Sequence, residues 1–261
     1  MKAEEKASKF YNSDGWSHDD DGNTLDANKW EDLRDCSKNY IADCRKRLNN
    51  YIPESGELFF DLGSGPIQYP EYLEYSSNFK ERHCLDLSQS ALEIAKSKGD
   101  NIKIFHGSFF EIPIEENKYD CSISQHVIYH MAKEDQLAAI NKLLDITKSG
   151  GKIVIVYGNP NSILELPYKI YRLIKRLFNL KTEHDLYHFV YPLRWWRQFN
   201  DRSKVEIYPW RTFNAFYLRN IIPNNSFGRY LLKIIFKLEN ILPKFLILAI
   251  AQYPTIVLTK D

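Results

Sequence analysis

Residues 58–66 constrain the fold of this chain more than any other part of its 261 residues. An apolar run, Leu-Phe-Phe, leads to Asp61, and glycines follow at positions 63 and 65. This order predicts a buried strand, a tight turn and the start of a helix, because glycine adopts positive φ and lets a ligand approach the backbone. Asp61 would then lie at the carboxyl end of the strand, where open α/β sheets bind their ligands.

A second acidic residue follows at a spacing that suits a nucleotide. Residues 82–86 are predicted to form a short strand that ends in Asp86, 25 residues after Asp61, where a carboxylate can hold the hydroxyls of a ribose. The dinucleotide fingerprint G-x-G-x-x-G would require a third glycine at position 68, which is occupied by Gln68. The missing glycine argues against an NAD enzyme.

The form D-x-G-x-G-P at 61–66, with L-D-L-S-x-x-x-L at 85–92, resembles the class I methyltransferases that use S-adenosylmethionine (SAM). Within that family the chain looks like the broad ubiquinone and menaquinone group of small-molecule methyltransferases. The resemblance covers residues 57–158. It implies SAM as cofactor, S-adenosylhomocysteine as product, and an α/β fold with a Rossmann-like, doubly wound sheet of seven strands. The last strand would be antiparallel and lie between strands five and six.

Alternating apolar runs and helical periods support this architecture. Strands are predicted to end at Asp61 and Asp86 and to span 102–105, 119–124, 153–157, 205–208 and 254–258. Ser88 is predicted to cap a helix over 89–98, and an apolar stripe predicts another over 230–241. A single helix is expected from Asp26, as N-cap, to Leu48, with Leu25 and Trp30 as a hydrophobic staple.

Four regions follow from this pattern. They are an N-terminal cofactor-covering segment and helix (1–50), the SAM-binding core (51–158), a helical and aromatic insertion on the substrate side (159–203), and C-terminal strands and helix that complete the sheet (204–261).

The resemblance also implies a set of cofactor contacts. Asp61 and the two glycines would line the methionine end of SAM, and Asp86 would bond the ribose. Family members commonly carry an acid after strand three that bonds the adenine amino group, and Ser108 replaces it here. An aromatic N-terminal segment often folds over the cofactor in such enzymes. The residues expected to contact SAM are Tyr11, Trp16, Asp61, Gly63, Gly65, Asp86, Leu87, Ser108, Phe109 and Gln125.

Methyl transfer needs few catalytic groups. SAM carries its own electrophile, so the protein must bind, align and shield the reactants. A nucleophilic oxygen also needs a base near its proton, unless it is already acidic. His126 and His130, which follow predicted strand four at a spacing of four, are the candidate catalytic bases. Structural histidines and a metal pair are the alternatives, and no metal is expected because no third ligand is evident beside them.

The insertion is expected to contact the substrate. His184, Tyr187, His188 and Tyr191 are the candidates, and the aromatic rings could wall an apolar pocket. The alternative is that they only pack the insertion against the core.

The helix predicted over 166–180 carries Lys169, Arg172, Lys175 and Arg176 beside its apolar stripe. Three interpretations stay open for this basic face. It could be the solvated side of a lid, it could recognise an anionic acceptor such as a sugar phosphate or a nucleotide- or lipid-linked sugar, or it could lie on an anionic membrane.

Composition limits the possible partners and location. Residues 1–159 carry 19 Lys and Arg against 27 Asp and Glu, whereas residues 160–261 carry 16 against 7. The four cysteines form no C-x-x-C pair and are expected to be reduced packing residues of a cytoplasmic protein. Neither a secretion leader nor an apolar span of ~20 residues is evident, so no transmembrane segment is expected. No motif typical of base methylation follows strand four, which argues against a nucleic-acid partner.

These observations favour a SAM-dependent methyltransferase that acts on a small molecule, on the oxygen of a sugar or natural-product intermediate. N-methylation of an amine or amino sugar stays open, as does a non-catalytic SAM-binding protein that recruits a partner. Substrate choice lies in the insertion, where analogy between folds ends. The acceptor and the oligomeric state are therefore left open.

Overall fold

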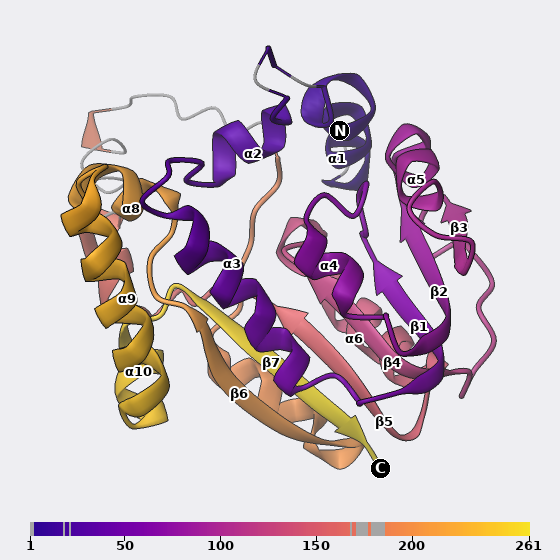
Figure 1. Cartoon of the computed structure of the whole chain (residues 1–261). Coiled ribbons are helices and arrows are strands. Elements are labelled where there is room, and N and C mark those ends of the chain that lie inside the picture. Colours follow the sequence, from indigo (N-terminus) through magenta and orange to yellow (C-terminus); the bar gives the residue numbers. More distant parts are fainter. Residues whose placement is uncertain (1–2, 18, 21, 168, 171–176, 179–185) are drawn as a thin grey trace.

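The structure is a computed structural model that describes the chain except for residues 1–2, 18, 21, 168, 171–176 and 179–185. Seven strands form one sheet in the order β3-β2-β1-β4-β5-β7-β6 (Figure 1). Their bounds are β1 Gly56–Leu62, β2 Phe79–Asp86, β3 Ile102–His106, β4 Tyr119–Gln125, β5 Thr147–Val156, β6 Ser203–Arg211 and β7 Tyr253–Lys260.

The strand order confirms the predicted architecture. Strands β1 to β5 pair in parallel, whereas β7 is antiparallel to both β5 and β6 and lies between them. Strand β5 begins at Thr147, earlier than the predicted residue 153. The carboxyl ends of β1, β2 and β4 meet at one edge, since Leu62 pairs with Leu85 on one side and with Ser124 on the other.

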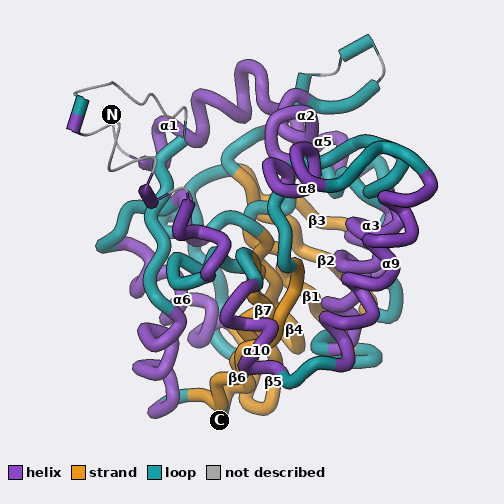
Figure 2. The backbone as a smooth tube through the Cα atoms, turned by 90° about the vertical axis from the view of Figure 1, so that its left-hand side faces the viewer, coloured by secondary structure: helices purple, strands orange, loops and turns teal. Residues whose placement is uncertain are grey.

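Helices cover both faces of the sheet, as the view along its plane shows (Figure 2). Successive strand residues point to opposite faces, so Phe60 packs in the cluster formed with α6, while Phe59 packs in the cluster formed with α3, α8 and α9. The helices are α1 (Ala3–Phe10), α2 (Leu25–Trp30), α3 (Lys38–Lys46), α4 (Pro70–Glu74), α5 (Gln89–Lys96), α6 (Asp135–Ile146), α8 (Ala215–Ile221), α9 (Ser226–Ile241) and α10 (Lys244–Ile250). Other helical segments are the π-helix η1 (Tyr11–Gly15) and the 3₁₀-helices η2 (Arg47–Asn50), η3 (Ile128–His130), η4 (Ile163–Glu165) and η5 (Leu193–Asp201).

The predicted N-terminal helix is wrong in two respects. Residues 26–48 form two helices, α2 and α3, and the N-cap of α2 is Thr24, whose hydroxyl accepts the N–H of Ala27 at 3.1 Å. Leu25 and Trp30 are exposed, so they form no staple.

Asp32 explains the break between α2 and α3. Its carboxylate accepts the backbone N–H of Arg34 at 3.3 Å and the hydroxyl of Ser37. Aspartate favours turns for this reason, because its side chain offers the backbone partners that a helix would otherwise supply. By contrast, Ser88 caps α5 as predicted, accepting from the N–H of Ala91.

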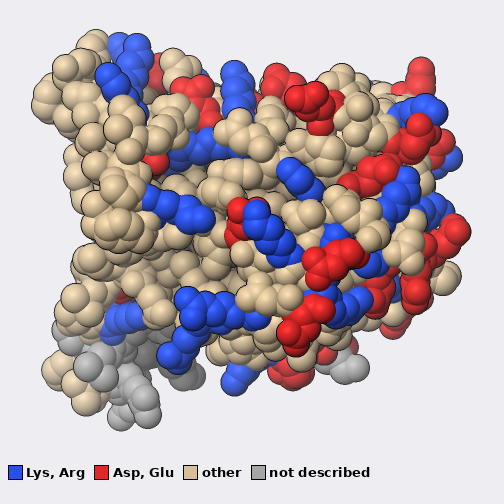
Figure 3. Space-filling view, turned by 90° about the horizontal axis from the view of Figure 1, so that it is seen from below, with Lys and Arg blue, Asp and Glu red and all other residues tan. Residues whose placement is uncertain are grey.

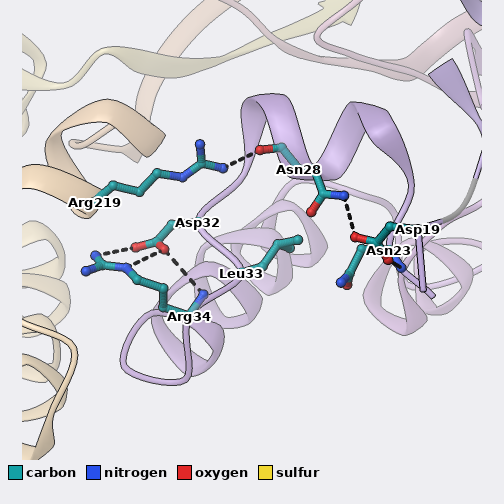
Figure 4. A pocket seen from close by; sticks show the side chains of 7 residues that line it. All are labelled: Asp19, Asn23, Asn28, Asp32, Leu33, Arg34 and Arg219. Atoms are coloured by element: carbon teal, nitrogen blue, oxygen red, sulfur yellow. Dashed lines mark hydrogen bonds and ion pairs between the residues drawn. The ribbon is translucent and has the colours of Figure 1, made fainter. Parts of the chain in front are cut away.

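A shallow hollow marks where the N-terminal segment joins α8 (Figure 4). The guanidinium of Arg34 binds the carboxylate of Asp32 and donates to the carbonyl oxygen of Ile222 at 3.0 Å. Arg219 donates to the carbonyl oxygen of Asn28 at 2.6 Å. Both arginines therefore fasten the N-terminal segment to the C-terminal helices, and the hollow is a structural junction.

Candidate functional site

The glycines at 63 and 65 form the predicted turn after β1. Their φ values are 70° and 53°, in the left-handed region that favours glycine. The N–H of Gly63 donates to the carbonyl oxygen of Leu85 at 2.7 Å, which ties the turn to β2. A Cβ at position 63 would lie 2.3 Å from Cγ2 of Val127. The turn therefore has no room for a larger residue there.

Asp86 lies directly against this turn. One carboxylate oxygen accepts the N–H of Gly65 at 2.8 Å, and the other accepts the N–H of Ser88 at 2.9 Å. Burial raises the pKa of Asp86, an effect that these backbone hydrogen bonds oppose. Each oxygen of a carboxylate has two acceptor positions, so a second hydrogen bond can form at each.

The side chain of Asp61 has a partner within the protein. Its carboxylate pairs with the guanidinium of Arg82, which is 1% exposed and also donates to the carbonyl oxygen of Tyr72. The pair joins the carboxyl end of β1 to the middle of β2. The expected role of Asp61 in cofactor binding therefore rests on its backbone position beside the turn.

The N-terminal segment covers the glycine turn. A Cβ on Gly65 would lie 2.8 Å from the ring of Trp16, which stacks on Tyr11 with ring centroids 5.2 Å apart. Asn12 donates to the carbonyl oxygen of Leu87 at 3.1 Å. Two residues expected from the sequence, Tyr11 and Trp16, thus reach the candidate site, and the indole N–H of Trp16 is buried with no hydrogen-bond partner among the described residues.

Asp26 is a candidate that the sequence suggested only as a helix cap. The hydroxyl of Tyr11 donates to its carboxylate at 3.2 Å. Burial raises the pKa of Asp26 to about 6, with the hydrogen bond from Tyr11 acting in the opposite direction. The charges of Asp26 and Asp86 both raise the pKa of Tyr11, after burial itself. An acid with a pKa near neutrality thus lies close to the candidate cofactor turn.

His126 follows β4 directly and is partly buried, with a positive φ of 60°. Its Nδ1 lies 2.8 Å from the hydroxyl oxygen of Tyr129, while its Nε2 is buried without a hydrogen-bond partner in the described chain. Burial, aided by the charge of Arg211, lowers the pKa of His126 to about 3. The ring is therefore neutral at physiological pH.

His130 bonds to the insertion. Its Nδ1 lies 2.7 Å from the carbonyl oxygen of Tyr187. A carbonyl can only accept, so Nδ1 carries the proton and Nε2 has the lone pair. Burial lowers the pKa of His130 to about 4. His188 is exposed, with its ring 5.9 Å from that of His130.

The structure describes only some of the other residues expected to contact the substrate. Tyr191 stacks on Trp195 at 4.4 Å, and its N–H donates to the hydroxyl of Tyr157 at 3.0 Å. This supports the packing alternative for Tyr191. His184 lies outside the described residues, as do Arg172, Lys175 and Arg176 of the predicted basic face. Lys169 donates to the carbonyl oxygen of Pro160.

The remaining expected cofactor residues differ in burial. The side chain of Phe109 is 2% exposed in the core, 5.9 Å from the ring of Phe60. The hydroxyl of Ser108 accepts the N–H of Phe110 at 3.2 Å. Gln125, at the end of β4, has a buried side-chain oxygen to which no group in the described part of the chain donates a hydrogen bond. An unsatisfied amide oxygen of this kind is costly, and it marks a place where a ligand group can bond.

A buried charge cluster is formed by Glu31, Arg45, Glu71 and Arg211, and the charges of three of its members act on His126. Glu31 binds Arg211 at 2.9 Å and Arg45 at 3.6 Å. Burial alone would raise the pKa of Glu31, but the two arginines outweigh it and hold the pKa below its usual value. Sequence reasoning missed this cluster, because Glu31 and Arg211 are 180 residues apart and neither belongs to a motif.

The described residues contain no group of three His, Cys, Asp or Glu side chains that could hold a metal ion. They also contain no helix with the length and apolar character that a membrane span requires.

The sequence of the middle of the chain is similar to that of known methyltransferases. The sequence model of the family described as "Methyltransferase domain" matches residues 60–155. An uncharacterized methyltransferase from Anoxybacillus flavithermus is 26% identical over 107 residues, which are 41% of this chain and 50% of that protein. The chain spans about half the length of the curated relatives it matches.

Solved structures share the fold. The geranyl diphosphate C-methyltransferase from Streptomyces coelicolor, in complex with Mg²⁺, geranyl diphosphate and S-adenosylhomocysteine, has a TM-score of 0.59 at 14% identity and covers 100% of this chain and 99% of that chain. Phosphoethanolamine N-methyltransferase 2 from Haemonchus contortus, in complex with phosphomonomethylethanolamine and S-adenosylhomocysteine, has a TM-score of 0.53 at 16% identity. That likeness covers 84% of this chain and 52% of the other. At these identities the likenesses show the fold alone.

Proposed function

We propose that this chain, which carries the domain of a class I SAM-dependent methyltransferase, binds SAM at the glycine turn and transfers its methyl group to a small-molecule acceptor. The observation that carries the proposal is the contact between Asp86 and Gly65. It places a carboxylate with unused acceptor positions beside a glycine backbone that a ligand can approach once Trp16 moves off Gly65.

The residues present fit SAM. Asp86 would accept the two ribose hydroxyls, and Gly63 and Gly65 would lie along the methionine end. The unpaired amide oxygen of Gln125 would accept a hydrogen bond from the cofactor. When bound, SAM supplies the electrophilic methyl group, and the protein's part is to align and shield it. Leu87 and Ser108 would contribute backbone and hydroxyl groups around the adenosine.

Three side chains compete for the role of general base. An effective base has a pKa near the working pH. Asp26, with a pKa of about 6, meets this condition better than His130 at about 4 or His126 at about 3. We therefore assign proton removal to Asp26 first, with the free Nε2 of His130 as the second candidate.

His126 has a different role in this proposal. Tyr129 donates its hydroxyl proton to Nδ1, because a phenol is a stronger acid than a neutral imidazole. Nε2 then carries a proton, and the buried N–H is a hydrogen-bond donor without a partner in the described chain. It would hold an oxygen of the acceptor in line with the methyl group.

The acceptor atom is proposed to be oxygen, because a base near neutrality and a hydrogen-bond donor together suit a hydroxyl. Nitrogen is the second candidate, as in the N-methyltransferase neighbour, because an amine can lose its proton to the same base. An anionic or lipid-linked acceptor would require cations such as Lys169, and Tyr187 and His188 are proposed as further substrate contacts, as is His184, which lies outside the described residues.

Cofactor binding is tested by calorimetry. The wild-type protein should bind SAM and S-adenosylhomocysteine and should not bind NAD. Asp86→Asn should weaken SAM binding by about tenfold to a hundredfold, because one charge-assisted hydrogen bond is worth about 1.5–3 kcal/mol. Asp100→Asn, an exposed acid after α5, is the matched control. Unchanged SAM affinity in Asp86→Asn would refute the proposed site.

The base is tested by the pH profile of methyl transfer. Small-molecule acceptors would be screened with methyl-labelled SAM, and the rate followed from pH 5 to 9. With Asp26 as base, the rate should fall below pH ~6, and Asp26→Asn should lower kcat by about 10²–10⁴ without changing SAM affinity. If only His130→Ala lowers kcat, the base is His130. If neither variant does, alignment alone suffices.

A further inference from the structure

Helices α9 and α10 present an apolar stripe to solvent. Phe227, Tyr230, Ile234, Leu238, Ile241 and Phe245 recur at spacings of three or four, and their exposed fractions range from 38% to 71%. On α9 this spacing places the first five on one face of the helix. Helix α9 ends at Ile241, the backbone is extended at Leu242, and Phe245 adds an exposed ring on α10. Exposed apolar patches of this size mark interaction surfaces.

A row of cations runs beside the apolar stripe. Arg229, Lys233, Lys237 and Lys244 are all exposed. The only carboxylate between residues 226 and 250 is that of Glu239, which is buried and paired with Arg47. From below, the flank on the left of Figure 3 is mostly tan and blue, while most of the red side chains gather on the right. The α9–α10 surface is therefore both apolar and positively charged.

We propose that the α9–α10 surface docks on an anionic lipid bilayer, with the apolar stripe entering the interface and the four cations meeting lipid headgroups. An in-plane amphipathic helix has this arrangement of a cationic face beside an apolar one. Docking differs from membrane spanning, and it does not depend on the proposed methyl transfer. It also uses a surface other than the basic face of the insertion.

Charge argues against a second copy of this chain as the occupant. In a two-fold dimer the same patch meets itself, so the cations of one copy would face those of the other. The nearby carboxylates of Asp35, beside Arg229, and Glu206, beside Lys244, already face cations of their own copy. A lipid surface with net negative charge has no such conflict. It also accepts a convex helix along its whole length, whereas a protein partner would need a matching groove.

Vesicle binding tests the proposal with the full-length protein. Vesicles of phosphatidylcholine alone would be compared with vesicles that contain one third phosphatidylglycerol, by co-sedimentation at low and high salt. Wild-type protein should bind only the anionic vesicles, and salt should reverse the binding because it screens exposed charges. Arg229→Gln/Lys233→Gln/Lys237→Gln should weaken partitioning by about tenfold or more.

A matched control distinguishes the effect of cations on the α9–α10 surface from the effect of lowering the net charge of the protein. Lys80→Gln/Lys96→Gln/Lys103→Gln removes three exposed cations at the β3 end of the sheet, and it should leave binding unchanged. Ser substitutions of Phe227, Ile241 and Phe245 should weaken binding without unfolding, because these side chains are 61%, 65% and 71% exposed.

Site-specific labelling gives a direct readout. All four native cysteines are buried, so an environment-sensitive dye would attach selectively to Ile241→Cys. Its emission should shift to the blue on anionic vesicles, whereas a dye on Lys96→Cys should not respond. Three results would overturn the proposal: no wild-type binding to anionic vesicles, equal loss in the Lys80/Lys96/Lys103 control, or a dimer in solution that the Ser variant dissociates.

Discussion

Replacing Asp26 by Asn should stabilise the fold at neutral pH while it impairs the proposed chemistry. Asp26 is half-buried on α2, and its pKa is raised by burial to about 6 from an ordinary value of 3.8. Asn has nearly the same shape, and its side-chain oxygen can still accept the hydroxyl of Tyr11. The substitution therefore removes the charge and little else.

The magnitude follows from the pKa shift. Between pH 3.8 and about 6 the folded protein keeps a proton on Asp26 that the unfolded chain has lost. Stability falls as pH rises wherever the folded state binds more protons. A shift of about 2 pKa units corresponds to about 3 kcal/mol, and this contribution is absent in Asp26→Asn. The variant should be more stable than wild type by up to about 3 kcal/mol above pH 6. Below pH 3.8 Asp26 is protonated in both the folded and the unfolded chain, so its titration should cause no stability difference between the two proteins.

The assay is urea unfolding of both proteins from pH 4 to pH 8. The difference between variant and wild type is the quantity of interest, because contributions that the two proteins share, such as the titration of His126 and His130, cancel in it. Asp135→Asn is the matched control, since Asp135 is an exposed acid in the first turn of α6. It reports the effect of removing a charge from a helix N-terminus.

A stability difference that stays constant with pH would refute the argument that burial shifts the pKa of Asp26. A loss of stability at pH 8 larger than that of the control would mean that the charged form of Asp26 is stabilised in the fold. The assignment of Asp26 as general base would then lose its physical basis.

Three further outcomes are expected. Arg82→Met should cost about 3–5 kcal/mol of unfolding free energy in urea melts, because it leaves the carboxylate of Asp61 buried without its partner; a cost below 1 kcal/mol would show that Asp61 is solvated. Gly228→Ala should destabilise the protein by about 3 kcal/mol, since the new Cβ would lie 1.9 Å from the carbonyl oxygen of Pro223; an unchanged melting temperature would contradict this packing. Trp16→Ala should speed tryptic cleavage of the N-terminal segment about tenfold, with wild-type rates indicating that other contacts hold the segment.

The sheet could be predicted from the sequence because its signals are local. Strands β1, β5 and β7 contain apolar runs bounded by polar or glycine residues, and the turn at Gly63 and Gly65 requires positive φ. Thr24 was missed because Thr24 and Asp26 are both suitable N-caps, and the choice depended on a staple that the exposed Trp30 does not form.

The candidate site was less predictable because its electrostatics are not local. Nothing in the sequence joins Asp61 to Arg82, or Glu31 to Arg211, since each pair forms only when separate elements pack together. Burial also sets the pKa of Asp26 and His126 in opposite directions, because it disfavours whichever form carries the charge. Residue type alone suggested a histidine base, whereas burial favours the aspartate.

The N-terminal segment has a consequence for the rate at which the protein can work. Trp16 lies on Gly65, and Asn12 holds the loop after Asp86, so the segment covers the turn at which SAM is proposed to bind. A spent cofactor could leave only after these contacts open, and its replacement could enter only then. Each turnover would include one opening of this gate, and solvent viscosity would slow the steady-state rate if opening limits it. The opening rate of residues 3–17 would then set the turnover rate, although none of these residues would need to contact the acceptor.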